Sequence, residues 1–135
     1  VVLGGGLVGA ETAEYLANKG LEVSIVEMMD KIAAQESETV LSLMEADFEK
    51  HNVQKFVNTR VSEIKDNVIY AVNTKDETNV EIAADTIVNA LGSKKNVFDD
   101  SKLTVPFTYV GDCSGERTAD IASAIRTGYK AANEI

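Results

Sequence analysis

The stretch VVLGGGLVG, residues 1–9, decides the fold of this chain. Its first three residues are apolar and predict a buried strand, and the glycines that follow are spaced as Gly4-x-Gly6-x-x-Gly9. Ala10 to Lys19 then carries apolar side chains at helical spacing, and Gly20 stands where a glycine ends a helix. A glycine turn that joins a buried strand to a helix is typical of dinucleotide-binding domains.

Each spaced glycine of this turn has a physical task. Gly4 permits the tight turn, Gly6 lets the backbone approach a pyrophosphate, and Gly9 lets the helix pack closely on the strand. The helix N-terminus adds free N–H groups and a partial positive charge, and both favour an anion. The alternative is a glycine turn that only joins the strand to the helix. The predicted phosphate-binding residues are Gly4, Gly5, Gly6, Leu7, Val8 and Gly9.

Glu27 closes the second predicted strand, Leu21 to Glu27. In dinucleotide-binding domains, an acidic residue near this position accepts hydrogen bonds from the hydroxyls of the adenosine ribose. A carboxylate there repels a 2′-phosphate, the next three residues include no arginine, and Lys31 is the nearest basic residue. The sequence therefore favours NAD over NADP, although Glu27 alone also fits a solvated carboxylate at a strand end.

The rest of the chain predicts a second helix, a small antiparallel β-meander in place of a crossover helix, two more strands and a last helix. This order predicts an α/β fold of the Rossmann-like, FAD/NAD(P)-binding kind, with a mostly parallel sheet. The elements are a helix over Ser37 to His51, strands over Phe56 to Val61, Val68 to Asn73, Val80 to Ala83, Asp85 to Ala90 and Phe107 to Val110, and a helix from about Thr118 to the end. The predicted buried face of that last helix comprises Ile121, Ala124, Ile125, Gly128, Ala131, Ala132 and Ile135.

Two further segments carry candidate binding residues. Ala90-Leu91-Gly92 ends a strand in small residues and lets the chain pass close to a cofactor, but an ordinary strand-end turn explains it equally well. Gly111-Asp112 places an aspartate between the last strand and the last helix. Such an aspartate suits sugar hydroxyls or a pyrophosphate, and a helix-capping role fits equally well.

Length and charge limit the classes of function. A chain of 135 residues is the size of one domain, and a net charge of −9 argues against binding to nucleic acid or to an anionic membrane. We find no signal peptide and no apolar run that would span a bilayer. The single cysteine excludes an internal disulfide and fits a reducing cytoplasm. Because the chain begins inside an apolar run without a methionine, we expect a fragment of a longer enzyme.

Several reactive residues receive no role. Cys113 lacks a second cysteine with which to cycle, and His51 stands near a helix end, where a cap or a surface position explains it. The acidic run from Glu36 to Glu49 fits the solvated face of a helix. No set of cysteine, histidine and carboxylate residues has the spacing of metal ligands, so no metal site is predicted.

Together these elements resemble the two-dinucleotide-binding-domain flavoproteins of the pyridine nucleotide-disulfide oxidoreductase type, in which an NAD(P) domain is inserted into an FAD domain. The resemblance covers nearly the whole chain. It is closest to the C-terminal half of old-yellow-enzyme-like NADH:flavin oxidoreductases, a group with 2,4-dienoyl-CoA reductases, enoate reductases and trimethylamine dehydrogenase. The residues most similar to that group are Gly9 to Glu14 and the ending Gly111-Asp112-Cys113.

The resemblance implies roles for the candidate residues. Gly4, Gly6, Gly9 and Glu27 would hold NAD(H), and Gly92 would lie beside the nicotinamide half. Gly111 and Asp112 would belong to the FAD side, because residues 107–135 resemble the C-terminal return segment of the FAD domain. The glycine fingerprint of an FAD domain is absent from the sequence, so FAD binding is expected in the full-length protein only.

We therefore expect an NAD(H)-binding domain that positions NADH for hydride transfer to FAD. By resemblance, electrons would pass onward to an N-terminal barrel that carries FMN and an iron–sulfur cluster and reduces an enoate- or dienoyl-type substrate. Hydride transfer itself needs no acid or base, so no catalytic residue is predicted here, and the isolated chain is expected to be inactive. One alternative is the NAD domain of a pyridine nucleotide-disulfide reductase, and another is a nucleotide-sensing or structural lobe without turnover.

Overall fold

The computed structural model describes residues 1–96, 99–114 and 121–134. The chain divides into two compact units, Val1–Gly92 and Ser93–Ile135. The first unit contains the strands β1 (Val2–Leu3), β2 (Ser24–Val26), β3 (Gln54–Phe56), β4 (Thr59–Lys65), β5 (Val68–Asn73), β6 (Asn79–Ala83) and β7 (Val88–Asn89), and the helices α1 (Leu7–Asn18) and α2 (Glu38–Lys50). The second contains the short 3₁₀-helix η1 (Gly111–Cys113) and α3 (Ile121–Asn133).

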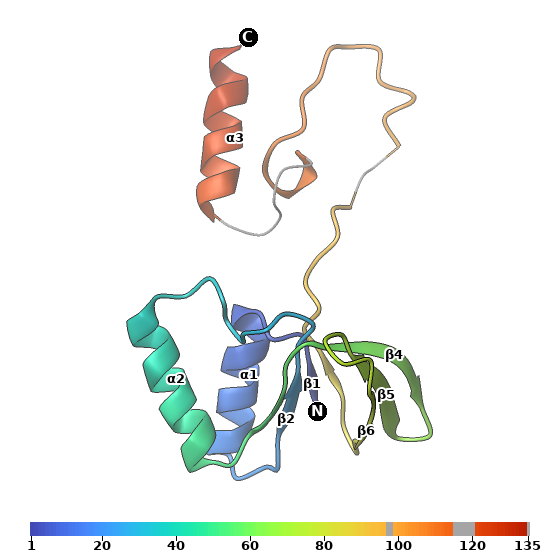
Figure 1. Ribbon diagram of the computed structural model, residues 1–135. Coiled ribbons are helices and arrows are strands. Elements are labelled where there is room, and N and C mark those ends of the chain that lie inside the picture. The colour runs from blue at the N-terminus through green and yellow to red at the C-terminus, as the bar shows by residue number, and fades with distance from the viewer. Residues whose placement is uncertain (97–98, 115–120, 135) are drawn as a thin grey trace. The chain divides into compact units, whose positions relative to one another are not determined.

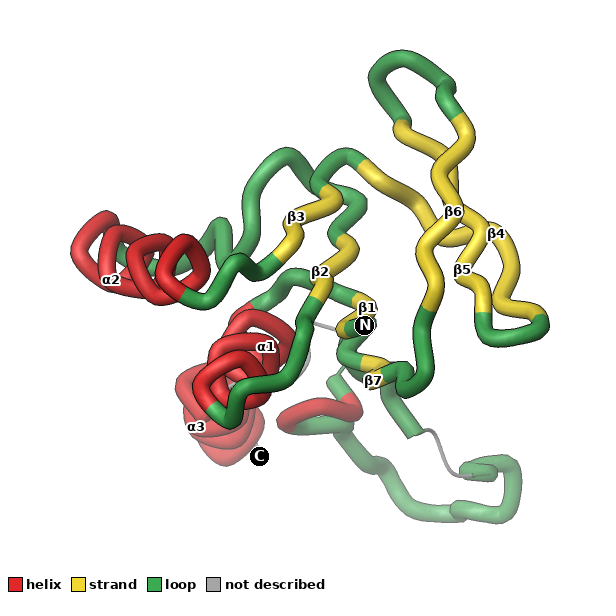
Figure 2. The backbone as a smooth tube through the Cα atoms, turned by 90° about the horizontal axis from the view of Figure 1, so that it is seen from below, coloured by secondary structure: helices red, strands yellow, loops and turns green. Residues whose placement is uncertain are grey.

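Four strands of the first unit form a parallel sheet in the order β3-β2-β1-β7. The helices α1 and α2 cover one face of this sheet, and the antiparallel meander β4-β5-β6 lies on the other side (Figures 1 and 2). The meander connects β3 at one edge to β7 on the far side of β1. It therefore takes the place of a crossover helix, which confirms the predicted α/β fold.

The alternation of side chains along β1 and β2 divides the core into two parts. Val2 and Ile25 belong to the helix side, where Met44 and Phe48 of α2 are also buried. Leu3 and Val26 belong to the meander side and pack with Ile69, Ile82 and Ala84. Both faces of the short central strands are thus buried at these four residues, which is why all four are apolar.

Local signals set the ends of the helices and the meander hairpin. The predicted ends of the first two helices agree with α1 and α2 within a few residues. Gly20 follows α1 with φ +82°, the left-handed conformation that commonly ends a helix. Asp66 and Asn67 have φ values of +51° and +62°, as a two-residue hairpin turn requires, and they join β4 to β5.

One predicted strand is in fact divided between the two sheets. Phe56 to Val61 was expected to form a single strand, but Phe56 ends β3 and Thr59 begins β4. The chain turns at Asn58, whose φ is +50°. Asparagine tolerates this conformation better than other non-glycine residues, so a corner forms without glycine or proline. The predicted strand over Asp85 to Ala90 is shorter in the structure, where β7 covers Val88–Asn89.

The second unit corrects two further predictions. The segment Phe107 to Val110 is not a strand, and its Phe107 and Tyr109 rings instead pack edge to face, with centroids 5.3 Å apart. In α3 the buried residues are Ser123 and Thr127, whereas Ile121 and Ile125, which were predicted to be buried, are 80% and 66% exposed. Residues 118–120 and 135 of that predicted helix lie outside the described residues.

Within the part of the chain that the structure describes, no helix combines the length and apolar composition that crossing a bilayer demands.

Candidate functional site

The glycine turn after β1 is shaped by close backbone contacts. Gly4 has φ +97° and donates its N–H to the carbonyl of Val26, at 2.9 Å. A Cβ atom on Gly4 would lie 2.4 Å from the carbonyl oxygen of Ala90, and one on Gly9 would lie 1.8 Å from that of Gly4. Glycine is thus required at both positions for the turn, α1 and the end of β7 to meet.

Gly6 differs from these two glycines, because the space around it is open. Its φ is −65°, which any residue adopts, and a Cβ atom there would meet no heavy atom within 4 Å. Gly6 is also the N-cap of α1, and no side chain caps this helix. Leu7 and Val8 in its first turn are exposed. The open side of Gly6 and the uncapped N–H groups fit a phosphate group.

The carboxylate of Glu27 is held in place beside this turn. Its Oε2 accepts a hydrogen bond from Gly5 N–H at 2.6 Å, and its Oε1 accepts one from Met29 N–H at 2.7 Å. A Cβ atom on Gly5 would lie 2.8 Å from Cβ of Glu27, so a glycine is needed beneath this side chain as well. Each carboxylate oxygen keeps a further lone pair for another donor. Glu27 is therefore an oriented acceptor rather than a freely rotating surface group.

A groove of about 380 Å³ joins these features. Most of the residues predicted for the first unit line it: Gly4, Gly6, Glu27, Ala90, Leu91 and Gly92. Its remaining lining residues are Val26, Met28, Thr59, Arg60 and Val61. The structure thus brings the ends of β1, β2 and β7 together at the carboxyl edge of the sheet, where ligands of open α/β sheets bind.

Three residues at the start of β4 were missed by the sequence analysis. Thr59, Arg60 and Val61 reach the groove because Thr59 N–H donates to the Glu27 carbonyl, at 2.8 Å. The only signal for this corner is Asn58, since asparagine is common in turns.

Gly111 and Asp112 lie in the second unit. Gly111 has φ +61° and donates its N–H to Oγ1 of Thr127 in α3, at 2.8 Å. Asp112 is exposed within η1. The Gly111-Asp112 motif is therefore tied to the last helix of its own unit.

The sequence matches the family model for pyridine nucleotide-disulphide oxidoreductases over residues 1–125. The chain belongs to this family. It is 48% identical over 138 residues to bilirubin reductase of Mediterraneibacter gnavus and 33% identical over 141 residues to NADH oxidase of Thermoanaerobacter brockii, covering all of this chain and 21% of each relative. A solved complex of 2-naphthoyl-CoA reductase matches with a TM-score of 0.72 and 28% identity, covering 99% of this chain and 20% of that one.

As a member of this family, the chain is a domain of the flavin-dependent pyridine-nucleotide oxidoreductase type. The chain spans about a fifth of the length of the curated relatives that it matches.

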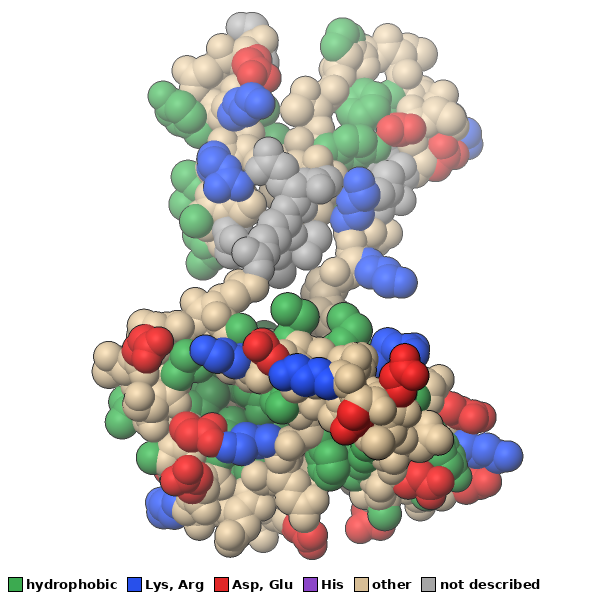
Figure 3. Space-filling view, in the orientation of Figure 1, with side chains coloured by type: hydrophobic (Ala, Val, Ile, Leu, Met, Phe, Trp, Pro, Cys, Tyr) green, Lys and Arg blue, Asp and Glu red, His purple; other side chains and the backbone are tan. Residues whose placement is uncertain are grey.

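A second hollow of the first unit is larger than the groove, at about 540 Å³. Its lining includes Leu41, Met44 and Phe48 of α2, and Lys55 forms an ion pair with Glu45 there. Figure 3 shows hydrophobic side chains in this region between acidic and basic ones. No glycine lines this hollow. The smaller groove is instead lined by Gly4 and Gly6 of the glycine turn and by Glu27.

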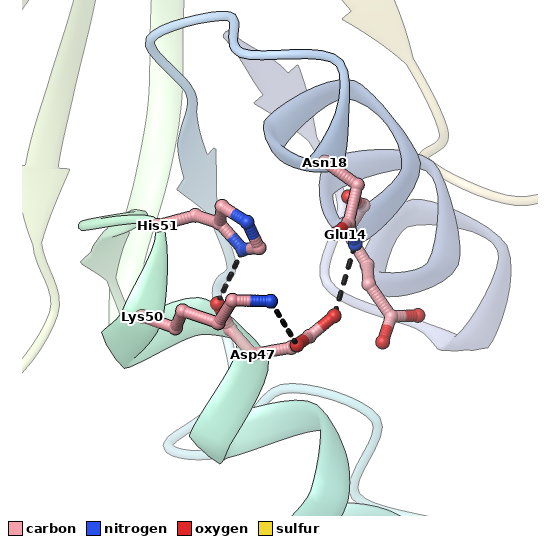
Figure 4. A network of polar contacts seen from close by, with 5 residues as sticks. All are labelled: Glu14, Asn18, Asp47, Lys50 and His51. Atoms are coloured by element: carbon pink, nitrogen blue, oxygen red, sulfur yellow. Dashed lines mark hydrogen bonds and ion pairs between the residues drawn. The ribbon is translucent and has the colours of Figure 1, made fainter.

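A polar network links α1 and α2 (Figure 4). Asn18 Nδ2 donates to Asp47 Oδ2 at 2.9 Å, and His51 Nδ1 lies 3.0 Å from the backbone oxygen of Asp47. Partial burial, followed by the nearby charge of Asp47, raises the pKa of Glu14. The hydrogen bond from Asn18 is the main cause of a lowered pKa at Asp47. The pKa values of these two facing carboxyl groups are thus shifted in opposite directions.

Proposed function

We propose that the first unit of this chain binds NAD(H) in the groove beside the glycine turn and presents its nicotinamide for hydride transfer to FAD. One observation carries the proposal. The carboxylate of Glu27 is fixed by two backbone N–H groups in the same groove that Gly6, the N-cap of an uncapped helix, lines. An oriented carboxylate and an open helix N-terminus are the two features that bind the ribose and the pyrophosphate of a dinucleotide.

Each end of the groove receives a part of the dinucleotide. The pyrophosphate lies over Gly6 and the first N–H groups of α1, where no Cβ atom or capping side chain interferes. The free lone pairs of Glu27 accept hydrogen bonds from the adenosine ribose hydroxyls. The nicotinamide half extends past Leu91 and Gly92, which line the groove at the end of β7. When bound, FAD supplies the acceptor for the hydride.

Residues 107–135 belong to the FAD side of the complete protein. Gly111 is held by Thr127 of α3, and this places the Gly111-Asp112 motif where it suits contact with the ribityl or pyrophosphate region of FAD. Ile121, Ile125 and Tyr129 recur at four-residue spacing on α3 and are 80%, 66% and 73% exposed. A stripe of this kind favours contact with another apolar surface, which the FAD domain provides.

The complete enzyme would reduce a conjugated carbon–carbon double bond in a barrel that holds FMN and an iron–sulfur cluster. The names of bilirubin reductase and 2-naphthoyl-CoA reductase support this proposal, because both name conjugated substrates. The alternative is a disulfide reductase, which the family description favours. The two differ in the remainder of the protein, since a disulfide reductase needs a redox cysteine pair there and the reductase of double bonds needs a barrel.

Calorimetric titrations of this chain with NADH and with NADPH test the binding site. We expect NADH to bind more tightly, and Glu27→Ala to weaken NADH binding by about tenfold or more, as expected for the loss of hydrogen bonds to a charged group. Glu22→Ala, which removes an exposed acid outside the groove, is the matched control and should leave the affinity unchanged. Equal or tighter binding of NADPH would overturn the role of Glu27. Binding of neither nucleotide would overturn the site itself.

A further inference from the structure

The groove contains one cation, Arg60, to which no role has been assigned. We propose that Arg60 is a specificity-determining residue that binds the 2′-phosphate of NADP(H) and thereby opposes the discrimination by Glu27. This inference rests on the proposed function of the groove. It implies that the preference for NADH results from two opposed charges, of which Glu27 is the stronger.

The position of Arg60 follows from the corner between β3 and β4. Glu27 N–H donates to the carbonyl of Phe56 at 2.8 Å, and the carbonyl of Glu27 accepts a hydrogen bond from Thr59 N–H at 2.8 Å. Thr59 is thus bonded directly to Glu27, and the backbone of the next residue, Arg60, is held beside it. A ligand group held at the carboxylate of Glu27 therefore lies in the same groove that the long side chain of Arg60 lines.

The charges of the groove single out the same residue. Among its lining residues, only Glu27 and Arg60 carry ionisable side chains. The carboxylate of Glu27 already accepts two backbone N–H bonds. The guanidinium of Arg60 is exposed and, within the residues that the structure describes, takes part in no hydrogen bond or ion pair. It is thus available to a ligand without first breaking an internal contact.

The chemistry of the two groups gives each a preferred ligand. A guanidinium binds a phosphate with two parallel hydrogen bonds, whereas a carboxylate repels it. At the ribose 2′ position, Glu27 favours the hydroxyl of NAD(H) and Arg60 favours the phosphate of NADP(H). The lining of the groove offers no other cation to take this role.

A double-mutant cycle on the complete flavoprotein tests this assignment. NAD⁺ and NADP⁺ are suitable probes because they differ only in the 2′-phosphate and deliver no hydride to the flavin. The variants are Arg60→Gln, Glu27→Gln and the double variant. Lys65→Gln is the matched control, since it removes one positive charge from the other end of the same strand, outside the groove. Thermal melting checks that every variant is folded.

We expect Arg60→Gln to weaken NADP⁺ binding by about tenfold, the usual value of one charge-assisted contact, and to change NAD⁺ binding by less than about threefold. Glu27→Gln should strengthen NADP⁺ binding, and the double variant should bind NADP⁺ about tenfold more weakly than Glu27→Gln alone. Lys65→Gln should change neither affinity.

Other results would overturn the proposal. An equal loss of NAD⁺ and NADP⁺ binding in Arg60→Gln, or a double variant that binds NADP⁺ as tightly as Glu27→Gln alone, would refute the role of Arg60 and leave the proposed function intact. A loss of NADP⁺ binding as large in Lys65→Gln would show a general effect of charge and would also refute it. Failure of the wild-type protein to bind either nucleotide would refute the proposed function together with this inference.

Discussion

The spaced glycines of the turn meet different physical demands, although they look alike in the sequence. Gly4 and Gly9 are needed by the fold, because a Cβ atom at either position would overlap a backbone carbonyl. Gly6 is not needed by the fold, since the space around it is open. If that space receives a pyrophosphate, Gly6 serves binding alone. A methyl group added at Gly6 should therefore lower the affinity for the nucleotide, whereas one added at Gly4 or Gly9 should lower the stability of the fold.

We expect Gly6→Ala to change the free energy of unfolding by no more than about 0.5 kcal/mol, as for other substitutions that meet no neighbour. The same change should weaken NADH binding by about tenfold or more, because the methyl group occupies the space for the phosphate. Gly9→Ala should instead destabilise the chain by about 3 kcal/mol or more, since its Cβ atom would lie 1.8 Å from a backbone oxygen.

Denaturant unfolding and calorimetry measure both quantities on each variant. Unchanged NADH affinity in a folded Gly6→Ala variant would contradict the proposed place of the pyrophosphate. A Gly9→Ala variant as stable as the wild type would contradict the close contact between α1 and the glycine turn.

Residue patterns predicted one half of the groove and missed the other half. The glycines, Glu27 and the Ala90-Leu91-Gly92 segment were found because each follows a strand whose apolar residues are evident in the sequence. Arg60 was missed because it begins a strand of the second sheet, and its approach to Glu27 depends on a corner at Asn58. Distant segments that meet only through such a corner leave no periodic pattern in the sequence.

At the scale of elements, the contact between α1 and α2 is expected to depend on pH. The pKa of Glu14 is raised above the ordinary value of 4.5, mainly by partial burial and then by Asp47. Its contribution to stability is thus fully present below about pH 4.5 and is lost as the pH rises through the raised pKa. The pKa of Asp47 is lowered from its ordinary value of 3.8. The contribution of Asp47 to stability is therefore present above about pH 3.8 and is lost as the pH falls through the lowered pKa.

We expect Glu14→Gln to raise the melting temperature of the chain at pH 7 and to have little effect near pH 4. The glutamine side chain can donate to Asp47 at every pH, and it carries no charge that Asp47 repels. Thermal unfolding across this range measures the difference. Glu49→Gln, an exposed acid on α2 outside the network, is the control and should show no such trend. A constant difference between Glu14→Gln and wild type at all pH values would contradict the pairing of the two carboxyl groups.

Elements with strong local signals were predicted correctly. Both helices of the first unit and the antiparallel β-meander are confirmed, since helical periodicity and turn residues act over a few neighbours. Phe107 to Val110 has the composition of a strand but is not one, because a strand also needs a partner and none pairs with it among the described residues. In α3 the expected burial of Ile121 and Ile125 likewise failed, because an amphipathic pattern does not identify the surface that covers it.

At the scale of the whole molecule, the core and the groove belong to the same unit. The buried clusters on the two faces of the parallel sheet contain residues between Val2 and Ala84 only. The groove is lined by residues from Gly4 to Gly92. The residues of the core clusters and of the groove lining all belong to the first unit, and in the second unit helix α3 carries an exposed apolar stripe. We therefore propose that the binding of NAD(H) and the contact with the FAD side belong to different units.

This division predicts that Val1–Gly92 folds and binds NADH without the second unit. A core with helices on one face of a sheet and a meander on the other buries enough apolar surface for a cooperative fold of this size. We expect the shortened chain to unfold in one transition and to bind NADH with an affinity within about threefold of that of the 135-residue chain, which is less than 1 kcal/mol. Circular dichroism melting and calorimetry test both expectations. If the shortened chain folds but does not bind NADH, the groove must depend on residues after Gly92, and the assignment of the two functions to separate units is wrong.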